Sequence, residues 1–221
     1  MLTPAEMEIL GTSFMVAAKA LLVLPLAIAT AFALSRPRLP GRLVLDGVTH
    51  LPIILPPVLI GFLLLMLFGR QGVLGGVLHL AFTQNGAALA TAVMIFPLLV
   101  RSIRLSFEAT DPRLFDAAAM LGASPLDRFV TVALPLALPG IVAGVVTAFA
   151  AAMGEFGAVI TFAANIPGQT QTLPLAIYAV LQQPGGEAEA MHLAVMSIAL
   201  ALAGLAAAQA FQQWTRRRLL G

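Results

Sequence analysis

The chain has 221 residues, of which 60% are hydrophobic and 10% are charged, whereas a soluble domain has roughly 45–50% apolar and about 25% charged residues. Because so few charges cannot cover the surface of a soluble fold, the composition excludes an ordinary soluble domain. The absence of cysteine, the wide spacing of the three histidines and a net charge of +2 without a basic stripe predict no disulfide, no metal site and no nucleic-acid partner.

Long runs without charge are the main feature of the sequence. A membrane helix needs about 20 consecutive apolar residues, and several runs approach or exceed that length. We therefore predict an all-α membrane protein, a polytopic bundle that forms a single domain over residues 1–221. Five spans are expected, over residues 10–34, 47–68, 86–106, 131–153 and 191–213.

The first span is expected to remain in the protein rather than to be cleaved as a signal peptide. Its flank carries Glu6 and Glu8 and has no basic residue before Lys19, the reverse of a signal peptide. Lys19 lies inside the apolar stretch, and we expect its flexible stem to carry the ammonium group to the outer membrane surface.

Two adjacent prolines interrupt the second span. Pro56 and Pro57 each lack the amide that a helical hydrogen bond needs, so a kinked span is expected. The following residues 72–82 are apolar, short and glycine-rich, and are predicted to form an external turn or an interfacial helix.

A capped helix is predicted after the third span. Asp111 followed by Pro112 is a typical helix start, and Gly122 suits the end of a helix that finishes at Leu121. This helix is expected to present one apolar face, made of Leu114, Phe115, Ala118, Ala119 and Leu121.

A second short helix is predicted to follow at once. Ser124, Pro125 and Asp127 have the spacing of a capping box, and Arg128 marks the membrane edge. Residues 111–128 are therefore expected to form a rigid element, the alternative being a loop that merely connects two spans.

Small residues follow one face of the fourth span. Gly140, Gly144 and Ala148 fall four apart, so the backbone of another helix or of a second copy of the chain can approach closely. Residues 156–186 are free of charge but contain polar and turn residues, and we expect them on the outer side. Within them Leu173–Leu181 is a candidate short helix that dips back, and a sixth full span stays open.

The distribution of the arginines predicts how the chain is oriented in the membrane. Five spans with the N-terminus outside place ten arginines in the cytoplasm, C-terminal tail included, and only Arg70 outside. Because cytoplasmic loops carry the excess of basic residues, we predict an outside N-terminus, a cytoplasmic C-terminus and a cytoplasmic element at residues 111–128.

The spacing within residues 116–135 resembles the EAA loop of binding-protein-dependent ABC importer permeases. That loop has an acidic residue, two alanines, three residues, glycine, nine residues and Ile-x-Leu-Pro. The matching positions are Asp116, Ala117, Ala118, Gly122, Leu134 and Pro135. Asp replaces Glu, and Val132 replaces Ile, which keeps charge and shape. The resemblance implies a MetI-like fold of the type I importer permeases, with residues 116–128 docking onto an ATPase subunit.

Later segments resemble the molybdate permeases, which are close to the sulfate and thiosulfate permeases. The resemblance lies in Gly-Glu-Phe-Gly at residues 154–157 and Asn-Ile-Pro-Gly at residues 165–168. It implies a permease for molybdate, with tungstate indistinguishable from it and sulfate or thiosulfate as the alternative.

A pathway or gate is the role suggested for eight residues, Glu155, Phe156, Gly157, Asn165, Pro167, Gly168, Gln169 and Thr170. A carboxylate repels an oxyanion, so Glu155 is assigned to hydrogen bonding or gating rather than to substrate binding, the alternative being a solvated helix end. The polar residues near position 170 are expected to line an outer vestibule or to meet a binding protein, and the alternative is an ordinary solvated loop.

The chain lacks a nucleotide-binding loop, so partner proteins are expected to supply ATP hydrolysis. No Gly-x-x-x-x-Gly-Lys-Ser/Thr loop occurs, so ATP and Mg are expected on a separate ATPase and no cofactor on this chain. The family implies a homodimer with two ATPase subunits and a periplasmic molybdate-binding protein, in a bacterial inner membrane. An intramembrane enzyme is disfavoured because no catalytic set is found in the spans. A stand-alone secondary transporter is disfavoured because the spans show no inverted repeats or ion-coupling carboxylates.

Overall fold

The computed structural model describes the backbone of residues 3–220 and the side chains as far as Leu202. Every regular element within residues 3–220 is helical, which agrees with the predicted all-α class. The elements are α1 (Pro4–Ala20), η1 (Leu21–Val23), α2 (Leu24–Leu34), α3 (Arg42–Ile54), α4 (Pro57–Phe68), α5 (Gln84–Glu108), α6 (Pro112–Met120), α7 (Pro125–Arg128), η2 (Phe129–Ala133), α8 (Leu134–Met153), α9 (Gly157–Ala163), α10 (Leu173–Leu181) and α11 (Glu187–Leu220).

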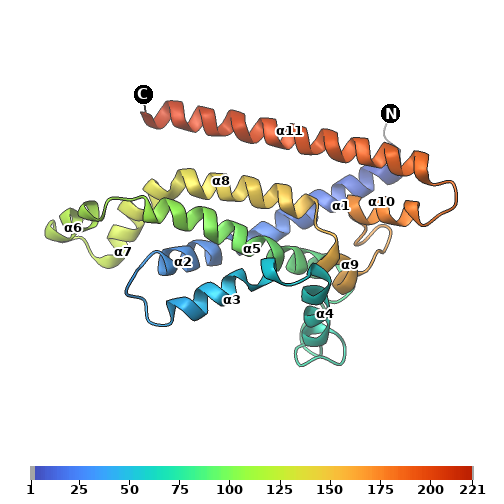
Figure 1. The fold of residues 1–221 in the computed structure, drawn as a ribbon, viewed down its shortest axis with the longest axis horizontal. Coiled ribbons are helices and arrows are strands. Elements are labelled where there is room, and N and C mark those ends of the chain that lie inside the picture. The colour runs from blue at the N-terminus through green and yellow to red at the C-terminus, as the bar shows by residue number, and fades with distance from the viewer. Residues whose placement is uncertain (1–2, 221) are drawn as a thin grey trace.

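Helix α5 is the centre of the bundle, with α1, α2 and α8 packed along it (Figure 1). Its Ile95, Leu99 and Ile103 are almost fully buried in a core shared with α2 and α8. Helices α6 and α7 lie at one end of the molecule, whereas α9 and α10 lie toward the other, and α4 projects to one side (Figure 1). The long helices therefore hold two irregular regions apart.

The small-residue face of α8 packs against α5. A Cβ atom on Gly140 would lie 2.6 Å from the Cβ of Ser106, and one on Gly144 would lie 3.2 Å from the Cβ of Ser102. The Ser102 hydroxyl also donates to the Gly140 carbonyl at 3.0 Å. The predicted close approach is confirmed, and its partner is a helix of the same chain.

The first span is one continuous helical segment. Helices α1, η1 and α2 join into 31 residues, Pro4–Leu34, with the mean hydropathy of a membrane span. Lys19 Nζ donates to Gln84 Oε1 at 2.8 Å and to Asn85 Oδ1 at 2.9 Å. Two neutral amides at the start of α5 thus solvate this cation, whereas the sequence predicted only that it extends to the membrane surface.

The second span is broken rather than kinked. Helices α3 and α4 meet at an angle of 112°, because Leu55 and Pro56 take extended backbone conformations, as residues that precede a proline do. The turn lets α4 pack against α9, and a Cβ atom on Gly61 would lie 2.6 Å from the Ala158 carbonyl oxygen. Residues 72–82, left open as a turn or an interfacial helix, form turns and a short stretch without regular structure.

Three helical segments in the described residues are long and apolar enough to cross a membrane, namely Pro4–Leu34, Gln84–Glu108 and Pro125–Met153. The bent pair α3 and α4 is a fourth candidate. The fifth predicted span, residues 191–213, falls in α11, and the side chains of residues 203 and 205–213 lie outside the described residues. The five-span arrangement and its orientation stay predictions.

Replacing Gly140 by valine tests the contact between α5 and α8. The added side chain meets Ser106, so we expect a loss of about 1–3 kcal/mol in stability, as for other overpacked cores. The measurement is thermal unfolding of the purified chain in detergent. Gly11→Val is the matched control, since a Cβ atom there has open space. Equal stability of the two variants would contradict the close contact.

Candidate functional site

The first helix of the predicted cytoplasmic element is capped at both ends. Asp111 Oδ1 accepts a hydrogen bond from the Arg113 amide at 2.9 Å, with Pro112 at the first helical position. Gly122 has φ +83°, a left-handed conformation that suits glycine, and the amide of Ala123 reaches back to the Ala118 carbonyl at 3.0 Å. The predicted caps are confirmed, although α6 ends one residue earlier than expected.

The second helix begins with the predicted capping box. The Asp127 amide donates to Ser124 Oγ at 3.2 Å, and the Ser124 amide donates to Asp127 Oδ2 at 3.1 Å. A turn of π-helix, η2, then joins α7 to α8. The chain therefore passes without a break in helical structure from the cytoplasmic element into α8, a junction that local signals did not predict.

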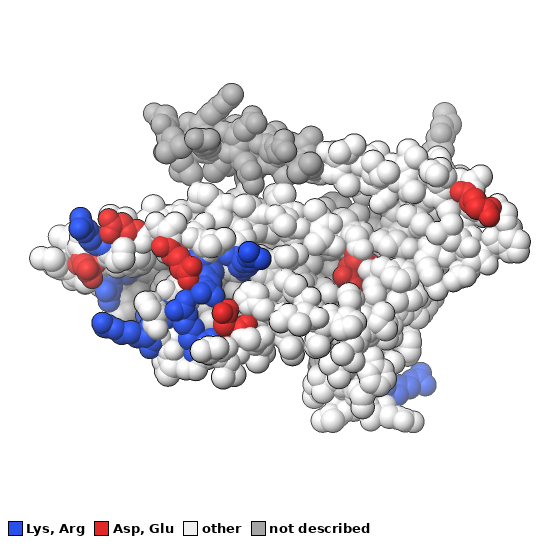
Figure 2. Space-filling model, in the orientation of Figure 1, with Lys and Arg blue, Asp and Glu red and all other residues white. Residues whose placement is uncertain are grey.

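The tip of this element is apolar and exposed. Met120 and Leu121 are each 89% exposed, and Leu126 is 71% exposed. Phe115 was predicted to lie beside Leu114, Ala118 and Leu121 on the projecting face, but that prediction is wrong, because Phe115 turns inward and packs against the core. Charged side chains surround this end of the molecule, and much of the middle is uncharged (Figure 2).

The six EAA-type positions differ in exposure. Asp116, Ala117, Gly122 and Pro135 are exposed, whereas Ala118 and Leu134 are half-buried. Leu134 and Pro135 begin α8 rather than belonging to the tip. The structure thus brings the first four positions together on α6 and its C-terminal turn, and places the last two at the root of the element.

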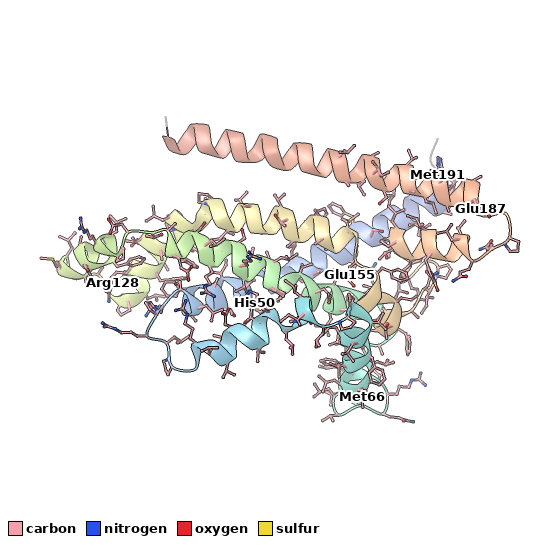
Figure 3. The ribbon with its side chains drawn as sticks, in the orientation of Figure 1. His50, Met66, Arg128, Glu155, Glu187 and Met191 are labelled. Atoms are coloured by element: carbon pink, nitrogen blue, oxygen red, sulfur yellow. The ribbon has the colours of Figure 1, made fainter. Side chains whose placement is uncertain are left out.

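A second site lies where α8 turns into α9. Glu155 Oε1 accepts a hydrogen bond from the Ala158 amide at 3.0 Å and so caps α9, and Glu155 lies near the middle of the molecule (Figure 3). A Cβ atom on Gly157 would lie 2.7 Å from Pro57 Cβ, and the Phe156 ring packs 5.1 Å from that of Tyr178. Gly157 therefore lies against the break between α3 and α4.

The loop that follows α9 is held by hydrogen bonds between its own residues. Thr170 is fully buried, and its hydroxyl donates to the Ala164 carbonyl at 2.9 Å and accepts from the Ile166 amide at 3.0 Å. Asn165 is half-buried, with its amide 3.5 Å from the Leu175 carbonyl. The exposed tip of the loop is Pro167, Gly168 and Gln169. The Thr170 hydroxyl is thus occupied inside the loop rather than presented to a ligand.

Sequence reasoning missed two contributors to this second site. Helix α9 was not expected, and neither was the role of Gly61, which allows α4 to touch α9. An isolated glycine inside an apolar helix was the available signal. Ala164 ends α9 at φ +59°, a conformation that costs a non-glycine residue roughly 1–3 kcal/mol, and no local pattern marks it.

The comparison with protein families agrees with this architecture. The chain belongs to the family described as binding-protein-dependent transport system inner membrane component, which matches residues 22–220. With the apolar helices described above, this membership makes it a multi-pass membrane permease.

Within this family, the chain is similar to permease proteins of molybdenum transport systems. The molybdenum transport system permease protein ModB of Escherichia coli K12 is 47% identical over 224 residues, covering 98% of each chain. ModB of Haemophilus influenzae is 45% identical over 221 residues, covering 97% of this chain and 95% of that one. The putative molybdenum transport permease YvgM of Bacillus subtilis is 39% identical over 176 residues, covering 76% and 78%.

Solved structures share the fold. A bacterial ABC transporter that imports alginate has a TM-score of 0.78 at 14% identity, covering 96% of this chain and 80% of that one. The inward-facing MetNI methionine ABC transporter has a TM-score of 0.72 at 15% identity, covering 93% and 92%. The fold is therefore that of ABC importer permeases of the MetI type, as predicted.

Removing the capping hydroxyl tests the rigidity of the cytoplasmic element. Ser124→Ala deletes the acceptor of the Asp127 amide, so we expect about 1 kcal/mol less local stability and faster hydrogen exchange in residues 125–131. The matched control is Thr147→Ala, whose exposed hydroxyl bonds only to its own helix. Unchanged exchange in Ser124→Ala would show that the capping box does not order this element.

Proposed function

We propose that the chain is the membrane-pathway subunit of an ATP-driven molybdate importer in the bacterial inner membrane. The observation that supports this most strongly is 47% identity over nearly the full length to a molybdenum transport permease. The residues first matched to that group, Gly154–Gly157 and Asn165–Gly168, lie in the second site and in the loop beside it. Tungstate has the same tetrahedral shape and charge and is expected to follow the same route.

The cytoplasmic element is proposed to dock onto an ATPase subunit. Its supports are the exposed apolar tip at Met120, Leu121 and Leu126, the caps at both helices and the EAA-type spacing of residues 116–135. In this proposal ATP and Mg bind to the partner, and this chain binds no cofactor and catalyses no reaction. Docking at residues 116–128 would pass movement directly into α8, because α7, η2 and α8 are continuous.

Other partners follow from the same proposal. The assembly would contain a second copy of this permease, two ATPase subunits and a periplasmic molybdate-binding protein. A related fold has been solved in a complex with a periplasmic protein carrying an alginate pentasaccharide. The exposed tip Pro167–Gln169 is proposed to meet the binding protein, because it lies on the loop that follows α9 and is predicted to be outside.

The second site is proposed to act as the gate. Glu155, Phe156 and Gly157 sit between the end of α8 and the break at Pro57, so a movement of α8 changes the packing of α4 and α9. The Glu155 carboxylate accepts a backbone hydrogen bond, which suits a positioning role and leaves anion binding to other groups.

A charged residue at the tip tests docking. Leu121→Glu places a carboxylate on the exposed apolar surface, and we expect ATPase retention in a pull-down from membranes to fall at least about tenfold, as for a hot spot. Val73→Glu is the matched control, since Val73 is 88% exposed and lies in the turn after α4. Full ATPase retention by Leu121→Glu would overturn the docking assignment.

Competition for uptake tests the cargo. Proteoliposomes with permease, ATPase and binding protein should take up labelled molybdate only with ATP, and unlabelled molybdate or tungstate should block this uptake. Sulfate in large excess should not block the uptake of molybdate. Equal inhibition by sulfate and molybdate would favour a sulfate or thiosulfate permease, and uptake without ATP would favour a stand-alone transporter.

A further inference from the structure

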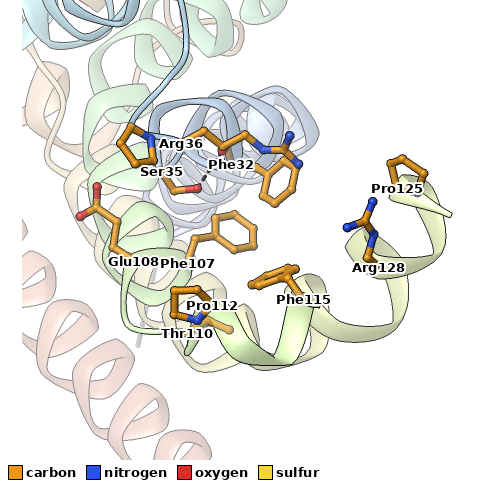
Figure 4. A pocket seen from close by; sticks show the side chains of 11 residues that line it. Phe32, Ser35, Arg36, Phe107, Glu108, Thr110, Pro112, Phe115, Pro125 and Arg128 are labelled. Carbon is orange, nitrogen blue, oxygen red and sulfur yellow. Dashed lines mark hydrogen bonds between the residues drawn. The ribbon is translucent and has the colours of Figure 1, made fainter. Parts of the chain in front are cut away.

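A cavity of about 600 Å³ lies beneath the cytoplasmic element. It is bounded by the end of α2, the end of α5, and helices α6 and α7, and Figure 4 shows the side chains that line it. The first span and the docking element therefore share this space, although they are far apart in sequence. The residues of the second site and of the exposed tip do not line this cavity.

One wall of the cavity is aromatic. Phe32, Phe107 and Phe115 turn their rings toward the space (Figure 4), and the Phe32 and Phe107 rings pack edge to face with centroids 5.3 Å apart. This wall explains why Phe115 points inward. Burial of apolar groups against these rings would be favourable, at roughly 25 cal/mol per Å² removed from water.

Two guanidinium groups, those of Arg36 and Arg128, also line the cavity. Arg128 Nε is inaccessible to solvent and has no hydrogen-bond partner among the described residues, a costly state for a charged donor. The Arg36 guanidinium carbon lies 4.4 Å above the Phe32 ring. Within the described chain neither arginine forms an ion pair, so both positive charges are available to an anion.

The Glu108 carboxylate at the rim of the cavity does not neutralise the charges of Arg36 and Arg128. Glu108 also lines the cavity, but its Oε1 accepts from Arg104 Nε at 2.8 Å and from Arg42 at 3.5 Å. Its charge is matched by those two arginines rather than by Arg36 or Arg128. The cavity is thus both apolar and cationic.

We infer that this cavity binds an anionic phospholipid, with the phosphate on Arg128 and Arg36 and the adjoining apolar part on the three phenylalanine rings. Arg128 was predicted to mark the cytoplasmic membrane edge, and basic pockets between helices at that depth suit anionic headgroups. Because Arg128 lines the cavity, its guanidinium can pair with a phosphate held there. A bound lipid joins α2 to α6 and α7 and so stabilises the docking element. This inference does not depend on which anion is transported.

Lipid binding to the purified full-length chain tests the inference. Native mass spectrometry in detergent would compare phosphatidylglycerol, zwitterionic phosphatidylcholine and inorganic phosphate. Wild type should bind phosphatidylglycerol in preference to phosphatidylcholine, and inorganic phosphate should not displace it. Arg128→Gln and Arg36→Gln should each bind it about tenfold more weakly, since each removes a charge-assisted hydrogen bond.

The control is Arg113→Gln, an exposed arginine on α6 that does not line the cavity, and it should bind lipid as wild type does. If Arg128→Gln fails to fold, as circular dichroism would show, Arg36→Gln decides the test, because that side chain is exposed. Wild-type affinity in both cavity variants would overturn the inference. Displacement of the lipid by inorganic phosphate at comparable concentration would also overturn it, in favour of a site for free oxyanions.

Discussion

The contact between α5 and α8 is the interaction on which the rest of the structure depends. Gly140 and Gly144 bring the α8 backbone against Ser102 and Ser106 of α5, and no larger residue fits there without movement. In a membrane, where the lipid is as apolar as the side chains, such close packing replaces the hydrophobic effect as the source of helix association.

Both candidate functional regions are attached to the ends of α8. Its N-terminal end continues from α7 and η2, so the predicted cytoplasmic element, residues 111–128, runs directly into this helix. Its C-terminal end leads into Glu155, which caps α9 against the break in the second span. In the proposed function, a displacement of residues 111–128 would reach the second site through α8 without an intermediate loop.

The candidate docking element was predictable because its signals are local. Asp111, Gly122, Ser124 and Asp127 act within three or four residues, and each lies where its spacing placed it. Phe115 was misassigned for the opposite reason. Helical periodicity assigns a residue to a face of its helix but does not say whether that face meets solvent or another span. Here Phe115 lines the same cavity as Phe32 and Phe107.

The sequence by itself determined the class of protein, the capped element and a disturbance of the helix at Pro56 and Pro57, which was expected as a kink, because composition, caps and missing amides act on neighbouring residues. Only the tertiary structure decided the 112° turn between α3 and α4, the internal hydrogen bonds of Thr170 and the cavity that joins Arg36 to Arg128. Each of these depends on groups that are distant in sequence and meet only after the helices pack, and no local pattern encodes which surfaces will meet.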